Sequence, residues 1–413
     1  MQGSRRQVIS WAVPLLVPGF GVTTQTPTSD LQTRIARLIE SYSSQGDHLT
    51  GSEVDHASAR WLADEIEALG VRVTLPAFTF SRVVVDQAEL QWNGQRIQGL
   101  PLFDGGTTGP AGVTGRIGGI NTDAEIGVVI ASPFPTHPGL APLRQARQAA
   151  RHRAIIVVTD LSLPPGGIAP INADEFHKPF GPPVLQVPNQ HWPVLQQAMA
   201  TGARLTMTIA THRAETTAVN VQAEIPGRDS ARPPMIVMTP RSGWGPCAAE
   251  RGGGLAAFME ILRRFRAEAP LRRVIFTANS GHELGHLGLK RFLSEHGALV
   301  NGAHVWMHLG ANFAAAKGRE VWLQFSSEDW RRRVLAFTQR ENLVADRDVP
   351  VGTPPLGEAK DIAAGKGAYV SILGANGLFH HPADRWPEAV DVATTARWVS
   401  AFAGLAQEAA NQP

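Results

Sequence analysis

Histidines and carboxylates collect in four short stretches of the second half of the sequence. They lie at 239–254, at 280–286, at residue 308 and at 379–384. Each stretch follows or ends an apolar run of the length of a buried strand. Mixed imidazole and carboxylate groups are ligands that suit zinc. The residue types therefore predict a site for one divalent metal, with zinc the best match.

The most local pattern is His282-Glu283-Leu284-Gly285-His286, which matches H-E-x-x-H. On a helix, the two histidines would share one face and the glutamate could activate a metal-bound water. The context is poor, because the pattern directly follows a predicted strand and a Ser-Gly turn and contains a glycine. A zincin-type site at 282–286 is therefore kept as a lesser alternative.

Strands and helices that could position these stretches alternate from residue 217 onward. Fully apolar strands that alternate with helices are typical of a mostly parallel sheet with both faces covered. Ligands of such folds bind beyond the carboxyl ends of the strands, which is where the polar stretches fall. The predicted strands are 235–238, 274–278, 304–307 and 368–372, and the predicted helices are 254–266 and 284–295.

The first half of the chain has a different pattern. Apolar periodicity predicts helices at 31–39 and 57–69, and strand-like runs follow at 71–74 and 82–92. Residues 101–216 then combine short β runs, one helix at 140–151 and many Pro and Gly turns. This change of character predicts an inserted, β-rich domain. Its predicted strands are 126–130, 154–159, 184–187 and 205–209.

The first 25 residues have the features of an export signal. Arg5 and Arg6 precede an apolar run at 8–17 that is too short to span a bilayer comfortably. The order Ser4-Arg5-Arg6-Gln7-Val8-Ile9 resembles a twin-arginine signal. We therefore expect export, with a periplasmic location. An uncleaved N-terminal tail is the alternative, because a clean cleavage site is missing.

Composition excludes several classes of protein. With 413 residues of which 43% are hydrophobic, the chain can bury a large core and is not a disordered or fibrous protein. The net charge of +2 is too small to indicate nucleic acid or an acidic membrane as the main partner. The single cysteine, Cys247, excludes an internal disulfide framework and a cysteine-based zinc ribbon.

From Leu31 to its C-terminus, the chain resembles the zinc aminopeptidase and glutamate-carboxypeptidase-like peptidases. The resemblance rests on motifs that occur in the family's order. They are Thr50-Gly51-Ser52 before a helix, the strand and turn at 219–227, Glu250-Arg251-Gly252-Gly253-Gly254, the stretch 281–288 and Phe379-His380-His381-Pro382-Ala383-Asp384. The resemblance implies a phosphorylase/hydrolase-like α/β fold and two zinc ions that share a bridging aspartate.

The same resemblance implies a division of the chain into domains. Residues 26–100 and 217–413 would form a discontinuous aminopeptidase-like domain, and 101–216 would be a protease-associated-like insert.

Several residues depart from the family's ligand pattern. Pro240-Arg241-Ser242 replaces the His-x-Asp pair, and Glu250 replaces the bridging Asp. His282 stands where the family has its catalytic Glu, whereas the adjacent ligand is kept as Glu283. In the last two ligand positions, an Asp becomes His308 and the final histidine is kept as His380.

These departures imply that the first zinc site has lost its histidine, and a cation at Arg241 would oppose a metal there. A single-metal site of Glu250, Glu283 and His380, with His308 as a further ligand, is the set that the resemblance leaves. Simpler roles stay open. Glu250 could form a structural salt bridge with Arg251 or Arg241, and His308 could be a satisfied core histidine.

The leading functional hypothesis is a hydrolase of an amide or peptide-like bond that uses this metal. His282 would act as general base, Glu283 as ligand, and Arg241 or a histidine would stabilise the oxyanion. Substrate-pocket residues are predicted at Trp244, His286 and His381. The alternative is a metal-free pseudopeptidase, a binding protein or an enzyme of non-hydrolytic chemistry that uses the same cleft. The expected partner is a peptide-like or amide small molecule.

Overall fold

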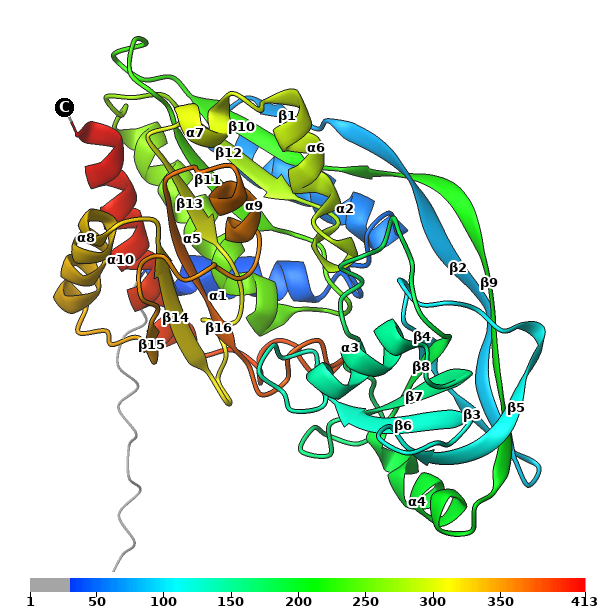
Figure 1. Cartoon of the computed structure of the whole chain (residues 1–413). Coiled ribbons are helices and arrows are strands. Elements are labelled where there is room, and N and C mark those ends of the chain that lie inside the picture. Colours follow the sequence, from blue (N-terminus) through cyan, green and yellow to red (C-terminus); the bar gives the residue numbers. More distant parts are fainter. Residues whose placement is uncertain (1–29, 413) are drawn as a thin grey trace, which may run out of the picture.

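The chain folds into two lobes, each built around one eight-stranded sheet (Figure 1). The structure is a computed structural model and describes residues 30–412. The export signal expected at 1–25 lies outside the described residues. No described helix combines the length and the hydrophobicity that crossing a bilayer requires.

Sheet A forms the larger lobe and has the strand order β1-β10-β12-β11-β13-β16-β14-β15. Its four central strands β12, β11, β13 and β16 are parallel, while β10 and β14 pair antiparallel to them. The predicted α/β class with a mostly parallel central sheet is confirmed. The strands are β1 (Val73–Thr74), β10 (Val221–Ile225), β11 (Met235–Pro240), β12 (Val274–Asn279), β13 (Val305–Leu309), β14 (Glu320–Phe325), β15 (Arg347–Asp348) and β16 (Tyr369–Ala375).

Helices cover both faces of sheet A, which is why nearly every residue of its central strands is buried. Met235 and Val237 of β11 pack in the core that contains α1, α2, α5, α8 and α10. Ile236 and Met238 pack on the other face, against α6 and α9. The helices are α1 (Asp30–Ser43), α2 (Glu53–Glu67), α5 (Ala248–Ala267), α6 (Leu287–Glu295), α7 (Leu299–Gly302), α8 (Glu328–Arg340), α9 (Ala359–Ala364) and α10 (Val392–Asn411).

Sheet B forms the smaller lobe, with the strand order β3-β2-β9-β5-β6-β7-β8-β4. The long strands β2 and β9 pair antiparallel and connect this lobe to sheet A (Figure 1). Sheet B takes in the β-rich segment expected from the sequence, and its protease-associated character stays a prediction. Its elements are β2 (Ala77–Trp92), β3 (Gln95–Gln98), β4 (Leu100–Pro101), β5 (Gly109–Gly119), β6 (Ile126–Ala131), α3 (Leu140–Ala149), β7 (Ala154–Thr159), β8 (Val184–Val187), α4 (Trp192–Ala200) and β9 (Arg204–Val219).

Three consecutive glycines lie inside the first turns of α5, because this helix begins at Ala248 and not at the predicted residue 254. Glycine lowers helix propensity by about 1 kcal/mol per residue, so the three glycines need another reason. A Cβ atom on Gly254 would lie only 2.7 Å from the Leu309 carbonyl oxygen and from Thr239 Oγ1. The glycines therefore let α5 approach the carboxyl ends of β11 and β13 closely, which brings the start of the helix to the predicted site.

We expect Gly254→Ala to destabilise the fold by about 1–3 kcal/mol, although alanine is the better helix former, because its methyl group has no room beside backbone oxygen. The midpoint of urea unfolding measures the effect. Gly302→Ala is the matched control, since a Cβ atom there meets nothing within 4 Å. A Gly254→Ala variant as stable as the wild type would contradict this packing.

Candidate functional site

The predicted site residues come together where β11, β12, β13 and β16 end. At the centre is an ion pair between two neighbours on the first turn of α5, with Glu250 Oε1 2.8 Å from Arg251 Nη2. His380 Nε2 lies 3.3 Å from the same carboxylate oxygen. All three side chains are buried. The structural salt bridge that the sequence left open for Glu250 is present, with Arg251 as its partner.

This pair sets the charge state of Glu250. Burial alone would raise the pKa of its carboxyl group, but the Arg251 guanidinium and His380 outweigh burial and lower this pKa to about 2. Arg251 also donates from Nε to the Ser242 carbonyl oxygen at 2.8 Å. The nearby Cys247 is buried, and burial raises the pKa of its thiol well above the usual value, so a thiolate nucleophile is not favoured.

Glu283 uses both carboxylate oxygens within the protein. Its Oε1 accepts from the Thr50 amide at 2.8 Å and from Thr50 Oγ1 at 2.5 Å, and its Oε2 accepts from Ser242 Oγ at 2.7 Å. Burial raises the pKa of Glu283 above its usual value despite these hydrogen bonds. The contacts fix the carboxylate against the loop before α2.

Arg241 forms a second buried ion pair. Its Nη1 lies 2.9 Å from Asp55 Oδ1, and its Nη2 donates to the Val219 carbonyl oxygen at 2.8 Å. Both charged side chains have no exposed surface. The prediction that Arg241 stabilises an oxyanion therefore needs correction, because its guanidinium is held inside the protein by Asp55.

The segment 282–286 is not an α-helix. His282–Leu284 form one 3-10 turn, and Gly281, Gly285 and His286 have positive φ angles. The zincin alternative is wrong for this reason and because Glu283 binds Thr50 and Ser242. The two imidazoles nevertheless stack, with ring centroids 4.8 Å apart.

A carboxylate from the start of α9 approaches each of these histidines. His282 Nδ1 lies 3.4 Å from Glu358 Oε1, and His286 Nδ1 lies 2.5 Å from Asp361 Oδ2. Burial, with Arg251 next in weight, lowers the pKa of His282 well below its usual value, so its imidazole is neutral near pH 7. A neutral imidazole oriented by a carboxylate can accept a proton, which agrees with the predicted role of a base. His286 is then a neighbour of this base.

His308 lies on β13 and is buried. Its Nδ1 is 2.8 Å from Ser371 Oγ on the adjacent strand β16, and its Nε2 has no hydrogen-bond partner. Burial lowers the pKa of His308 to about 4. His308 is thus hydrogen-bonded within the core at Nδ1 alone, and both roles that the sequence left open remain predictions.

The residues predicted as ligands do not fit a metal ion as they are placed. Within residues 30–412, no three His, Cys, Asp or Glu side chains are arranged to hold one. The physical reasons are direct. The Arg251 cation already neutralises Glu250, and both Glu283 oxygens accept hydrogen bonds from Thr50 and Ser242.

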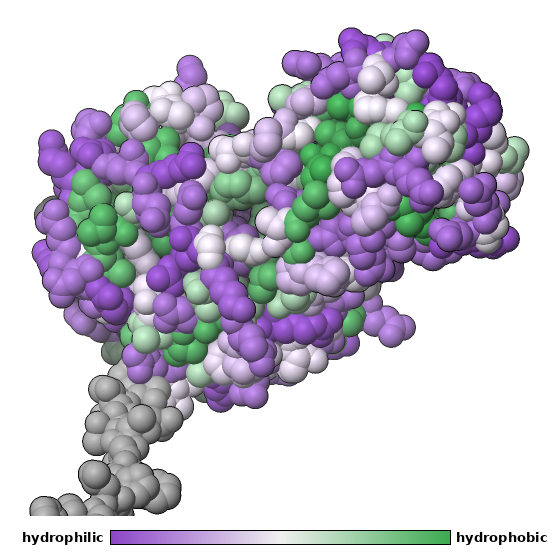
Figure 2. All heavy atoms as spheres, turned by 90° about the horizontal axis from the view of Figure 1, so that it is seen from below, coloured by the Kyte–Doolittle hydropathy of each residue, from purple (hydrophilic) through white to green (hydrophobic). Residues whose placement is uncertain are grey.

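A segment of the smaller lobe, residues 169–176, covers the site. His380 Nδ1 donates to the Pro170 carbonyl oxygen at 2.5 Å, and the Ala173 amide donates to the Glu283 carbonyl oxygen at 2.9 Å. Trp244 is half-buried beside this segment and donates from Nε1 to Asn172 Oδ1 at 2.9 Å. The surface is hollowed between the two lobes (Figure 2).

Of the predicted pocket residues, Trp244 thus lies where the lobes meet. His381 is buried, and its Nδ1 accepts from the Ala383 amide at 3.1 Å. This contact closes a turn in the loop after β16, so His381 shapes the loop that carries His380.

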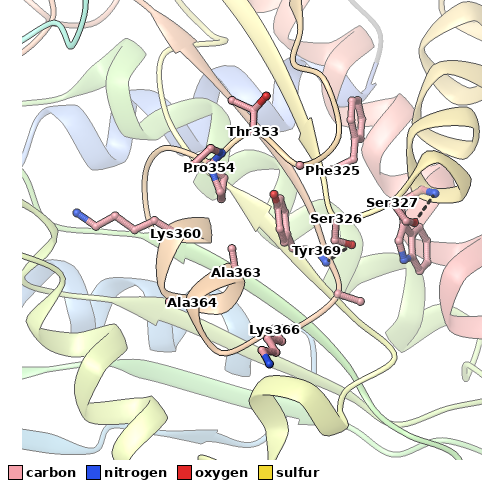
Figure 3. Close-up of a pocket in the computed structure, with 15 residues that line it drawn as sticks. Phe325, Ser326, Ser327, Thr353, Pro354, Lys360, Ala363, Ala364, Lys366 and Tyr369 are labelled. Atoms are coloured by element: carbon pink, nitrogen blue, oxygen red, sulfur yellow. Dashed lines mark hydrogen bonds between the residues drawn. The ribbon is translucent and has the colours of Figure 1, made fainter.

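A cavity of about 710 Å³ lies elsewhere, between the end of β14 and the start of β16 (Figure 3). Because β16 is parallel to β13, its first residue, Tyr369, marks the edge of the sheet opposite the predicted site. Lys360 and Lys366 at this cavity point in different directions (Figure 3). The cavity therefore does not belong to the site.

Sequence reasoning missed three acidic residues of the site: Asp55, Glu358 and Asp361. Asp55 follows Ser52 at the capping distance of three residues, and its amide donates to Ser52 Oγ at 3.1 Å. That spacing indicates a helix start and no partner for an arginine. Glu358 and Asp361 lie in a region with no strong periodic pattern, so no signal pointed to them.

Comparison of the sequence with protein families and with curated proteins finds no match. Comparison of the fold with solved structures gives similarities over nearly the whole chain. A zinc aminopeptidase from Bacillus subtilis is 14% identical with a TM-score of 0.74, over 94% of this chain and 97% of that one. The chain has the zinc aminopeptidase fold. The resemblance drawn from the motifs is thereby confirmed at the level of the fold.

Two further structures share this fold. A peptidase precursor from Shewanella amazonensis is 18% identical with a TM-score of 0.73, over 92% of this chain and 95% of that one. An aminopeptidase from Aneurinibacillus is 14% identical with a TM-score of 0.65, over 92% of this chain and 94% of that one. The high coverage of both chains means that the smaller lobe is part of the shared architecture.

Proposed function

We propose that this chain binds a peptide-like ligand where its two lobes meet and does not catalyse metal-dependent hydrolysis. The observation that carries the proposal is the Arg251 guanidinium 2.8 Å from Glu250, inside the set of residues where the motifs place metal ligands.

Metal-dependent hydrolysis requires an ion with an open coordination position for water or substrate. A guanidinium is permanently protonated and offers only N–H donors, so it neutralises a carboxylate but cannot ligate and activate a water. Arg251 thus provides positive charge at the site without supplying Lewis acidity. Both oxygens of Glu283 are hydrogen-bonded within the protein, to Thr50 and Ser242, which holds this carboxylate in place.

Access supports the same proposal. The segment 169–176 packs against Glu283 and His380, whose side chains are buried. A substrate would have to displace this segment before its scissile bond could reach Glu250. A ligand that binds at the outer rim, beside Trp244, needs no such displacement.

The ligand class is proposed from the fold and from Trp244, which lies at the edge of the site where the two lobes meet. The solved structures that share the fold are described as aminopeptidases and peptidases. Trp244 offers an aromatic face, which suits peptide-like groups, and its indole N–H is bonded to Asn172. The His282 side chain is 12% exposed, so this imidazole is accessible to solvent while Glu250 and Glu283 are not.

A hydrolase with a single metal is the second candidate. One observation favours it: Glu250 Oε1 and His380 Nε2 are buried and have no hydrogen-bond partner. Buried polar atoms without a hydrogen-bond partner can be preorganised metal ligands.

The two candidates predict different results for purified protein incubated with zinc and then freed of unbound metal. We expect no retained zinc, no cleavage of aminoacyl-nitroanilides, and a saturable change of tryptophan fluorescence when short peptides are added. Retained zinc in a 1:1 ratio, with cleavage that a chelator abolishes, would favour the hydrolase.

Trp244→Phe is the matched variant for the binding measurement, because it keeps an aromatic ring and removes the indole N–H that reaches Asn172. We expect it to weaken peptide binding roughly tenfold, because the ring loses the hydrogen bond to Asn172 that orients it. If no peptide changes the fluorescence of the wild type, the binding proposal fails.

A further inference from the structure

Arg251 contacts Glu250 and acts electrostatically on other residues of the predicted metal set. Its guanidinium contacts Glu250, and its charge stabilises and is stabilised by the carboxylates of Glu250 and Glu283. The same charge helps to lower the pKa of His282 and of His308. One fixed cation therefore acts electrostatically on carboxylates and imidazoles alike, as a bound metal ion would.

Two atoms of this cluster have the spacing of metal ligands. Glu250 Oε1 and His380 Nε2 are 3.3 Å apart. Two ligands that each lie about 2.0–2.1 Å from one tetrahedral zinc are roughly 3.3–3.4 Å apart. The spacing is long for a hydrogen bond and matches a pair of ligands.

The imidazole is oriented as a ligand as well. The Pro170 carbonyl oxygen can only accept, so His380 Nδ1 must carry the hydrogen of that 2.5 Å contact. Nε2 is then the ring nitrogen that faces Glu250 Oε1. A backbone carbonyl that fixes the tautomer in this way is the usual support of a metal-bound histidine.

The cation itself is poorly bonded. Arg251 Nη1 and Nη2 are buried and have no hydrogen-bond partner, although Nη2 is 2.8 Å from Glu250. The side chain is held by its charge and by one Nε hydrogen bond to Ser242. Such a contact compensates the charge of Glu250 without the fork geometry of a structural arginine–carboxylate pair.

We infer that Arg251 is a built-in substitute for a metal ion, and that shortening its side chain uncovers a divalent-cation site with Glu250 and His380 as its first two ligands. Water that enters the vacated volume would complete the coordination. The inference rests on the proposed function, in which the wild-type chain takes up no metal.

The test compares thermal unfolding with and without zinc for the wild type, Arg251→Ala and Arg251→Lys. We expect Arg251→Ala to be less stable than the wild type without metal, because Glu250 is left uncompensated. Zinc should raise its unfolding temperature saturably, by roughly 5 °C or more at a concentration well above the dissociation constant. The wild type and Arg251→Lys, which keep a cation, should not respond.

The double variant Arg251→Ala/His380→Ala should lose the response, which separates this site from zinc bound at surface histidines. If Arg251→Ala does not fold without metal, Arg251→Met preserves the apolar stem and is tested in the same way. If neither Arg251→Ala nor Arg251→Met responds to zinc, and the wild type is free of metal, this inference is overturned and the proposed function still stands. A zinc response and hydrolysis by the wild type would overturn both.

Discussion

Replacing Arg241 with alanine is expected to destabilise the protein by about 3–5 kcal/mol, because it leaves a buried carboxylate without its cation. Asp55 and Arg241 have no exposed surface, so water cannot replace the lost partner. The midpoint of urea unfolding, at an unchanged slope, measures the loss.

The size of the effect follows from how many elements the pair joins. Asp55 Oδ2 accepts from the Gly51 amide at 2.9 Å and from Ser280 Oγ at 2.8 Å, while Arg241 reaches Val219. The pair thus connects the loop before α2, the end of β9, and the carboxyl ends of β11 and β12. Loss of the pair should therefore weaken the packing of the segments that carry the site.

Arg291→Ala is the control for removing an arginine from an ion pair. Its partner Glu295 is one turn away on α6, and Arg291 is 50% exposed, so we expect a change within about 0.5 kcal/mol. The double variant Arg241→Met/Asp55→Leu should recover part of the stability, because no charge is left buried. If Arg241→Ala lowers the free energy of unfolding by less than about 1 kcal/mol, the Asp55–Arg241 pair does not connect these elements strongly.

The sheet elements of the fold were predictable because burial leaves a direct record in the sequence. Residues 154–159 and 184–187 were expected as strands and are β7 and β8 with the same bounds. Helix starts were less predictable. Gly252–Gly254 suggested that α5 begins late, yet these glycines lie within the helix because close packing against Ile39, Phe313 and Leu309 outweighs their low propensity.

The cluster itself was also predictable, because parallel strands bring their carboxyl ends to one edge. The function of the cluster could not be predicted in the same way. The motifs placed Glu250 among metal ligands, but its partner is the adjacent Arg251, whose side chain direction depends on how α5 packs. Likewise, Arg241 pairs with Asp55, 186 residues earlier in the chain, and no local pattern connects them.

Asp384 provides the second large prediction, which concerns pH. Its carboxylate oxygens accept from the amides of Ala249 and Glu250 at 2.7 and 3.0 Å, at the start of α5. Burial, together with the charge of Glu250, outweighs these hydrogen bonds and raises the pKa of Asp384 from its usual 3.8 to about 7. The folded protein therefore holds a proton that the unfolded chain releases.

The sign follows from proton binding. Between pH 4 and pH 7, the unfolded chain binds fewer protons at Asp384 than the folded protein, so this residue's contribution to stability falls as pH rises. It is fully present below the unfolded pKa and lost above pH 7. A shift of about 3 units at about 1.4 kcal/mol per unit gives a loss of roughly 4 kcal/mol.

Other buried groups act in the opposite direction. Burial lowers the pKa of His48 to about 3 and that of His308 to about 4, so their contributions rise with pH up to the pKa of the unfolded imidazole. The total pH dependence of the wild type therefore does not isolate Asp384. A difference between two variants does, because both histidines are common to each.

The measurement is the free energy of unfolding of the wild type and of Asp384→Asn, in urea, from pH 4.5 to pH 8. Asparagine does not ionise, so the wild type should lose stability relative to the variant as pH rises to 7, and the difference should then level off. A constant offset from the changed capping contact does not alter this slope. Asp64→Asn, on the exposed side of α2, should run parallel to the wild type throughout. If Asp384→Asn also runs parallel, Asp384 is ionised in the folded protein, and the amides at the start of α5 stabilise its charge more than burial and Glu250 oppose it.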